Sequence, residues 1–187
     1  LNKPIKFGFV RGPVWNFGNE DMKHGIEEFV KNVQLDIEEL DLGKDFDYAA
    51  KAHEIIMNGS IANSLINYYQ ADKSNLHPFT VKRIEAGISV SASDYVSAIE
   101  QAKKMEQSLR QLFLKYDAII TPAAPGQAPR DLMNTGNAIF NGYWTMMGVP
   151  AISLPLLKGK DDLPIGIQFI ANWNADLKLL EICKYIL

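Results

Sequence analysis

The sequence lacks the residue pattern of a self-contained catalytic centre. Nucleophilic catalysis requires a Ser, Cys or Thr beside a base, usually on a sharp turn, and no Gly-x-Ser-x-Gly sequence occurs. Ser60, in Asn-Gly-Ser-Ile-Ala, comes nearest, but it falls within an expected helix and has no base near it in sequence. His24, His53 and His77 are widely separated and form no His-x-x-x-His pair. We therefore expect no catalytic residue, metal site or cofactor site in this chain.

Thr121 is the first residue that suits a binding cleft. It follows a short, largely apolar strand expected at 117–120, and with Pro122 it opens a loop that contains two further prolines. Open α/β sheets bind ligands beyond the carboxyl ends of their strands. We therefore expect Thr121 to contact a substrate.

Four residues on one expected helix form a second candidate site. Asn137, Phe140, Asn141 and Trp144 recur at the spacing i, i+3, i+4, i+7, which places them on one helix face. Two amides and two aromatic rings suit neither a dry core nor open solvent. Two roles remain open for this face: it can pack in the core and cap the helix, or it can form a wall that contacts a substrate. Gln168 is a weaker candidate, because a buried Gln can equally satisfy backbone groups.

The composition excludes several classes of partner. Hydrophobic residues make up 47% and charged residues 22% of the 187 residues, as in globular proteins. The net charge is −3 and the basic residues do not cluster, so no nucleic-acid partner is expected. No apolar run approaches the ~18 residues of a membrane span, and no signal-peptide pattern is present, so we expect a cytoplasmic protein. Cys183 is the single cysteine, which excludes an internal disulfide.

The first forty residues indicate a strand, a helix and a second strand. Ile5–Val10 is short, β-branched and aromatic, and Leu35–Leu42 alternates apolar and charged residues. Between them, Asn19 is expected to cap a helix with an acidic first turn and apolar residues at helical spacing. Strand, helix, strand in this arrangement predicts a parallel pair.

The remainder predicts further helices and three more strands. Helices are expected at 46–70, 79–88, 91–115, 138–147 and 175–187, the third of them opened by a capping box at Ser91. A strand is expected at 117–120. The apolar runs 149–156 and 165–171 flank a turn at 158–162 and predict adjacent central strands covered on both faces. The prediction is one α/β unit over residues 1–187, with a layered, mixed but largely parallel sheet flanked by helices.

The order of three motifs resembles the C-terminal part of the amidase signature family. They are the strand ending in Thr121-Pro122, the segment from Trp144-Thr145 to Pro150-Ala151, and Leu-Pro-Ile-Gly-Ile-Gln at 163–168. The resemblance is dense from Tyr116 to Leu180 and loose before it. It implies an enzyme that hydrolyses amides with two serines and a lysine, but no Gly/Ser-rich signature that would carry the serines occurs here.

The expected function is therefore the C-terminal portion of an amidase-type amidohydrolase that contributes substrate-pocket wall. The expected partners are a small amide substrate, an N-terminal catalytic half that precedes Leu1, and further copies of the chain in a homo-oligomer. One alternative is a non-catalytic α/β binding or interaction domain. Another is a fragment of the amidotransferase subunit that supplies ammonia for tRNA charging.

Overall fold

A central sheet and its covering helices are defined in the computed structural model, which describes residues 4–131 and 133–187. In chain order the first strands and helices are β1 (Lys6–Phe9), α1 (Glu20–Asn32), β2 (Asp36–Glu39), α2 (Ala49–Asp72), α3 (Pro78–Ile88) and α4 (Ala92–Leu112). They are followed by β3 (Ala118–Pro122), α5 (Ile139–Met147), β4 (Ala151–Lys158), β5 (Pro164–Ile170) and α6 (Asp176–Ile186). Three short 3-10 helices occur at 15–17, 44–46 and 73–75.

The sheet of the described residues has the strand order β2-β1-β3-β5-β4. β1 pairs in parallel with β2 and with β3, whereas β5 runs antiparallel to both β3 and β4. Four of the five strands therefore run in one direction. The predicted α/β class with a mixed, largely parallel sheet is confirmed, and so is the parallel pair formed by β1 and β2.

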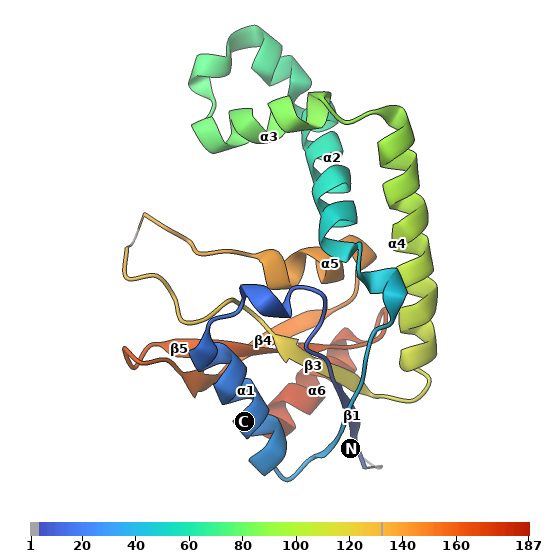
Figure 1. Ribbon diagram of the computed structural model, residues 1–187, viewed down its shortest axis with the longest axis vertical. Coiled ribbons are helices and arrows are strands. Elements are labelled where there is room, and N and C mark those ends of the chain that lie inside the picture. Colours follow the sequence, from blue (N-terminus) through green and yellow to red (C-terminus); the bar gives the residue numbers. More distant parts are fainter. Residues whose placement is uncertain (1–3, 132) are drawn as a thin grey trace.

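Helices cover both faces of the sheet (Figure 1). In that view α1 and α6 lie below the sheet, where α1 contacts β4 and α6 contacts β4 and β5. α5 lies above the sheet, and α2 and α4 both pack against α5. The core between these layers contains aromatic side chains of two strands, β1 and β5, and of α5: Phe7, Phe9, Phe169, Phe140, Tyr143 and Trp144.

The helix starts follow the capping expected from the sequence. The Asn19 side chain accepts a hydrogen bond of 2.9 Å from the Met22 amide, and Glu20 and Asp21 lie at the positive end of the α1 dipole. At α4, the Ser91 hydroxyl accepts from the Asp94 amide at 3.0 Å. Both predicted N-termini are confirmed.

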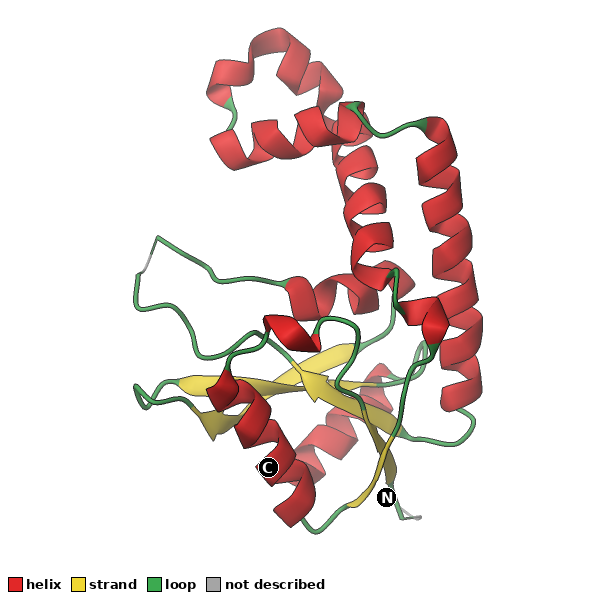
Figure 2. Ribbon diagram, in the orientation of Figure 1, coloured by secondary structure: helices red, strands yellow, loops and turns green. Residues whose placement is uncertain are grey.

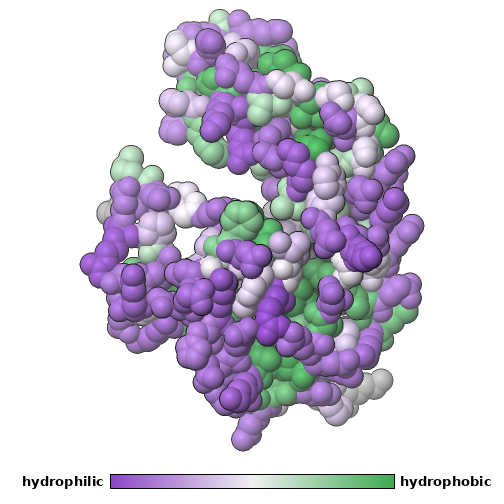
Figure 3. Space-filling model, in the orientation of Figure 1, coloured by the Kyte–Doolittle hydropathy of each residue, from purple (hydrophilic) through white to green (hydrophobic). Residues whose placement is uncertain are grey.

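Residues 49–88 form a helical arm, made of α2 and α3, that projects away from the sheet (Figure 2). The two helices approach closely at Gly87, where a Cβ atom would collide with the Asn58 carbonyl. The space-filling view shows a hollow between the tip of the arm and the loop that precedes α5 (Figure 3). Although α2 and α4 have 24 and 21 residues, no helix in 4–131 and 133–187 is long and apolar enough to cross a membrane.

The predicted strand pair near the C-terminus requires one correction. β4 and β5 are adjacent as expected, and β5 is interior, with Ile165, Ile167 and Phe169 fully buried. β4, however, is an edge strand in which only Leu154 is buried and the other residues are exposed or partly buried. Its apolar run suggested burial on both faces, but Pro155 inside the run has no N–H to donate, which suits an edge position.

Candidate functional site

Thr121 lies at the carboxyl end of β3, in the centre of the sheet. All five residues of β3 are buried, and Thr121 is fully inaccessible. Its register partner on β5 is Gln168, which is 4% exposed and is itself the partner of Ser153 on β4. Register partners point to the same face of a sheet, so Thr121, Gln168 and Ser153 form a polar row across three strands.

The polar row continues into α5 through unpartnered groups. Among the described residues, four buried side-chain atoms have no hydrogen-bond partner: Thr121 Oγ1, Gln168 Nε2, Tyr143 OH and Trp144 Nε1. Burial raises the pKa of Tyr143, while hydrogen bonding with the nearby Thr121 hydroxyl and Trp144 indole acts in the opposite direction, so these three groups interact with one another although none meets the geometry of a regular hydrogen bond. Buried polar groups are usually paired, and each unpaired one costs about 1–3 kcal/mol. Such a concentration is unusual for a purely structural core.

A cavity of about 640 Å³ opens beyond the end of β3. Its walls are the loop 123–129, the segment 134–138 before α5, Asn141 on α5, and Ser153 and Gly166 on the two C-terminal strands. Ser153 thus connects the polar row to this cavity. The volume falls in the range of sites for small organic ligands.

Hydrogen bonds on two sides hold the loop wall in place. On one side, the Asn19 amide donates to the Pro125 carbonyl at 2.7 Å. On the other side, Asp161 in the β4–β5 turn accepts from Gln127 Nε2 and, at 2.7 Å, from Arg130 Nη2. The loop is therefore fastened to α1 and to the turn at the same time, which keeps the cavity open on a rigid frame.

The four residues expected on one helix face separate into two environments. Phe140 and Trp144 are 0% and 1% exposed and pack in the core. Asn141 is half-buried on the first turn of α5 and lines the cavity. Asn137 was expected on the helix but precedes it; its side chain accepts from the Ile139 amide at 3.0 Å, and this turn starts the helix two residues later.

Sequence reasoning missed Ser153, Gln127 and Asp161 as contributors to the site. A signal for Ser153 existed, because aligning 149–156 against 165–171 as a hairpin places it opposite Gln168. Gln127 and Asp161 are 34 residues apart and meet only in the folded chain. The prediction of a turn at Asp161-Asp162 is confirmed, with Asp162 at φ 61°.

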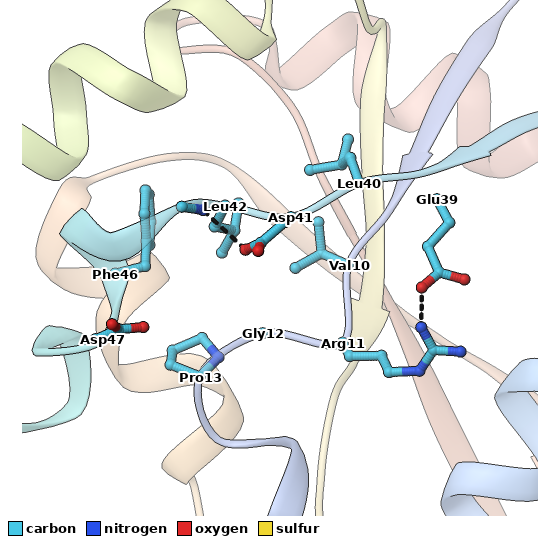
Figure 4. A pocket seen from close by; sticks show the side chains of 11 residues that line it. Val10, Arg11, Gly12, Pro13, Glu39, Leu40, Asp41, Leu42, Phe46 and Asp47 are labelled. Atoms are coloured by element: carbon cyan, nitrogen blue, oxygen red, sulfur yellow. Dashed lines mark hydrogen bonds and ion pairs between the residues drawn. The ribbon is translucent and has the colours of Figure 1, made fainter.

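Another cavity, of about 510 Å³, lies at the carboxyl ends of β1 and β2 (Figure 4). Arg11 reaches from the end of β1 to Glu39 at the end of β2, and it also donates to Glu27 on α1 at 3.0 Å. The Asp41 carboxylate accepts from the Gly43 amide at 2.9 Å. Because Arg11 is already paired with the carboxylates of Glu27 and Glu39, its charge is neutralised within the protein, and we do not assign this cavity to a ligand. In the described residues, no group of three or more His, Cys, Asp or Glu side chains is placed to hold a metal ion.

Comparison with known proteins identifies the family. A family profile described as Amidase matches residues 2–180. The chain belongs to the amidase family. Its relatives include the A-type subunit of the glutamyl-tRNA(Gln) amidotransferase of Aliarcobacter butzleri, which is 34% identical over 125 residues, covering 61% of this chain and 28% of that protein. The fatty acid amide hydrolase of Medicago truncatula is 32% identical over 110 residues, covering 52% of this chain and 18% of that protein.

Solved amidase-family structures share the fold. A structure described as an amidase superposes with a TM-score of 0.84 at 16% identity, covering 96% of this chain and 45% of that chain. The 6-aminohexanoate cyclic dimer hydrolase superposes with a TM-score of 0.73 at 18% identity, covering 96% and 44%. The chain thus spans less than half the length of these amidase-family proteins.

Proposed function

We propose that this chain is the C-terminal portion of an amidase domain whose intact enzyme hydrolyses a carboxamide C–N bond. Three observations support the proposal. The family profile matches residues 2–180, the superposed amidase is about twice as long, and the 187 residues contain no Gly/Ser-rich segment of the kind that carries the family's serines. In this proposal residues 1–187 are one α/β unit that supplies pocket wall and no catalytic triad.

The observation that carries the proposal is the 640 Å³ cavity at the carboxyl end of β3, whose wall includes three asparagines, Asn134, Asn137 and Asn141. The amide groups of Asn137 and Asn141 can donate to a carbonyl oxygen and accept from an N–H, so they match both ends of an amide bond. Thr121, Phe140, Trp144 and Gln168 form the buried layer behind this wall. The layer fixes the position of the wall against the substrate.

The proposed partner is an N-terminal catalytic half that brings the nucleophile to the cavity. β4 presents an unpaired edge and exposed or partly buried apolar residues, so the sheet of this chain can be extended there. A small amide would then react at the boundary of the two halves.

The test is to read the coding sequence upstream of Leu1 and to express the whole reading frame. We expect an upstream segment with two serines and a lysine, and hydrolysis of simple aryl amides by the whole protein. Asn141→Ala in that protein should lower kcat/KM. A reading frame that encodes no such segment upstream of Leu1 contradicts the proposal and favours a non-catalytic binding domain.

A second candidate is favoured by the names of the relatives. Several of them are A-type subunits of glutamyl-tRNA(Gln) amidotransferases, from Alkaliphilus metalliredigens and Treponema denticola as well as Aliarcobacter butzleri. If this chain is part of such a protein, the whole protein should use glutamine as ammonia donor and require a tRNA-bound acceptor. An amidase should instead release ammonia from free amides without tRNA.

A further inference from the structure

The loop wall of the 640 Å³ cavity consists mostly of residues whose side chains cannot anchor it. Residues 123–129 read Ala-Ala-Pro-Gly-Gln-Ala-Pro, and all of them line the cavity. Ala, Pro and Gly have no side-chain group that donates or accepts a hydrogen bond. Gln127 is therefore the one residue of this wall whose side chain can fix the position of the backbone around it.

Both ends of the Gln127 amide are used by Asp161 in the β4–β5 turn. Gln127 Nε2 donates to the Asp161 carboxylate, and Gln127 Oε1 accepts from the Asp161 backbone amide at 3.2 Å. The turn approaches so closely that a Cβ atom on Gly159 would lie 2.3 Å from Gln127 Oε1. A contact through two hydrogen bonds fixes the orientation of the side-chain amide as well as its distance.

The other carboxylate oxygen of Asp161 holds the end of the wall. It accepts from Nη2 of Arg130, the residue after Pro129, at 2.7 Å. The hydrogen bond from Gln127 is the main cause that lowers the pKa of Asp161; desolvation opposes this effect, and Arg130 and Lys160 reinforce it. Asp161 is thus ionised at neutral pH, and both of its carboxylate oxygens are engaged by the same loop.

The turn that carries Asp161 is itself anchored. The Lys160 amide donates to the Asp21 carboxylate on α1 at 3.3 Å, and the Gly159 amide donates to the Leu163 carbonyl at 2.9 Å. Asp161 is not among the described residues that line the cavity. Its effect on a ligand must therefore pass through the loop.

The first residues of the wall have backbone anchors that do not involve Asp161. The Ala123 amide donates to the Gly166 carbonyl at 3.2 Å, and the Pro125 carbonyl accepts from the Asn19 amide at 2.7 Å. Loss of the contact to Asp161 should consequently release only the part of the wall that follows Pro125 and leave the sheet intact.

We propose that Asp161 is a positioning residue of the substrate cavity, which acts through Gln127 to hold the backbone of the wall against the substrate. The inference rests on the proposed function, because it takes this cavity as the substrate site. The wall contacts the substrate but carries no reacting group. Its displacement therefore weakens binding of the ground state and of the transition state alike, which raises KM and leaves kcat unchanged.

The first measurement uses the 187-residue chain and needs no turnover. Asp161→Ala and Gln127→Ala each remove the contact from one side. In either variant, the NMR order parameters of the Gln127 and Ala128 amides should fall from about 0.85, the value of a rigid backbone, to below about 0.6. Asp162→Asn is the matched control, because it removes the same charge from the same turn, where Asp162 pairs with Lys158 at 2.8 Å, and asparagine tolerates the positive φ of this position. It should leave both order parameters unchanged.

The second measurement uses the whole enzyme and simple aryl amides. Either single substitution should raise KM at least about fivefold and leave kcat within about twofold. The double variant should be no worse than either single variant, because all three lack the same contact. Asp161→Asn, whose side-chain oxygen can still accept from Gln127, should keep KM within about threefold of the unmodified enzyme. Asp162→Asn should leave both constants unchanged.

The two measurements separate failure of this inference from failure of the proposed function. If the whole protein hydrolyses no amide, the proposed function fails, and the order parameters alone decide whether Asp161 positions the wall. If an active whole enzyme keeps its KM in Asp161→Ala, or if the wall stays rigid in both single variants, the positioning role is overturned and the proposed function stands. Thermal denaturation identifies a variant that does not fold, and the other single variant then decides.

Discussion

Thr121 and Gln168 are register partners across the antiparallel β3–β5 pair, and each carries a buried polar atom without a hydrogen-bond partner among the described residues. Interior strands of a sheet usually present apolar side chains at such positions. Here the two polar side chains are in register with Ser153 on the next strand, and Ser153 lines the cavity that we assign to the substrate.

Replacing Thr121 by Val should be nearly neutral for stability. The hydroxyl makes no regular hydrogen bond with the described residues and interacts only weakly with the nearby Tyr143 hydroxyl, so the substitution removes a poorly paired polar group and keeps the shape. We expect the free energy of unfolding in urea to change by less than about 1 kcal/mol. Ile119→Ala, on the same strand, is the control and should lose about 2–5 kcal/mol. A loss above about 2 kcal/mol in Thr121→Val would show that the hydroxyl has a partner that matters.

The chain alone should hydrolyse no amide or ester above background. No recognisable Ser–Lys pair is present in its sequence, and without a base a serine hydroxyl stays protonated at neutral pH. The measurements are turnover of aryl amides and labelling by a serine-directed fluorophosphonate. Stoichiometric labelling of any serine, Ser60 included, contradicts this prediction.

Substitution of Trp144 should lower stability, whereas substitution of Asn141 should change substrate selectivity. Trp144 is 1% exposed, so Trp144→Ala should cost about 3–5 kcal/mol of unfolding free energy. Asn141 borders the cavity, and Asn141→Ala in the intact enzyme should change the preference for bulky over small acyl groups by more than about tenfold, with little change in Tm. The opposite pattern, with selectivity lost only in a stable Trp144→Phe variant, would assign the substrate contact to the tryptophan.

The isolated chain should associate through β4. This edge strand carries unpaired backbone groups beside apolar side chains, and such edges recruit other strands. We expect light scattering to show a mass that rises with concentration. Ala151→Lys, an exposed change on β4, should shift the chain toward monomer, whereas Ala71→Lys at an exposed position of the arm should not. A monomer at every concentration refutes the prediction.

Folding stability should decrease on acidification because of His53. Its pKa in the fold is lowered, first by burial and then by Arg83, while Glu54 acts in the opposite direction. The unfolded chain, with an ordinary pKa of about 6.5, therefore binds the proton at a higher pH than the fold does, and stability decreases as pH falls through about 6.5. The titratable groups that line the same cavity as His53 also include Lys51 on α2 and Tyr143 on α5.

The measurement for His53 is urea denaturation at pH 7.5 and pH 5. The loss of stability on acidification should be smaller in His53→Gln than in the unmodified chain. His24→Gln, at an exposed position, should retain the full loss. Identical pH dependence in all three proteins would exclude His53 as the cause.

Local patterns in the sequence predicted the elements better than the site. The capping side chains of Asn19 and Ser91 act within three residues, so both helix starts were predictable. The position of Asn137 was not, because its side chain can bond a nearby amide in a turn as well as lie on a helix. Trp144 is buried on α5, which packs against α2 and α4 from distant parts of the chain, and the periodicity of α5 alone does not report this packing.

Pro155 and the irregularity between Leu154 and Leu157 divide the free edge of β4. A regular edge remains only from Ala151 to Leu154. Along it, every second residue points its backbone N–H and C=O groups toward β5, and the residues between them point these groups outward. An incoming strand therefore finds room for a short ladder that stops at a residue without an N–H. Endless strand-on-strand stacking, the route to fibrils, is blocked at this edge, while a single well-fitted strand is still admitted.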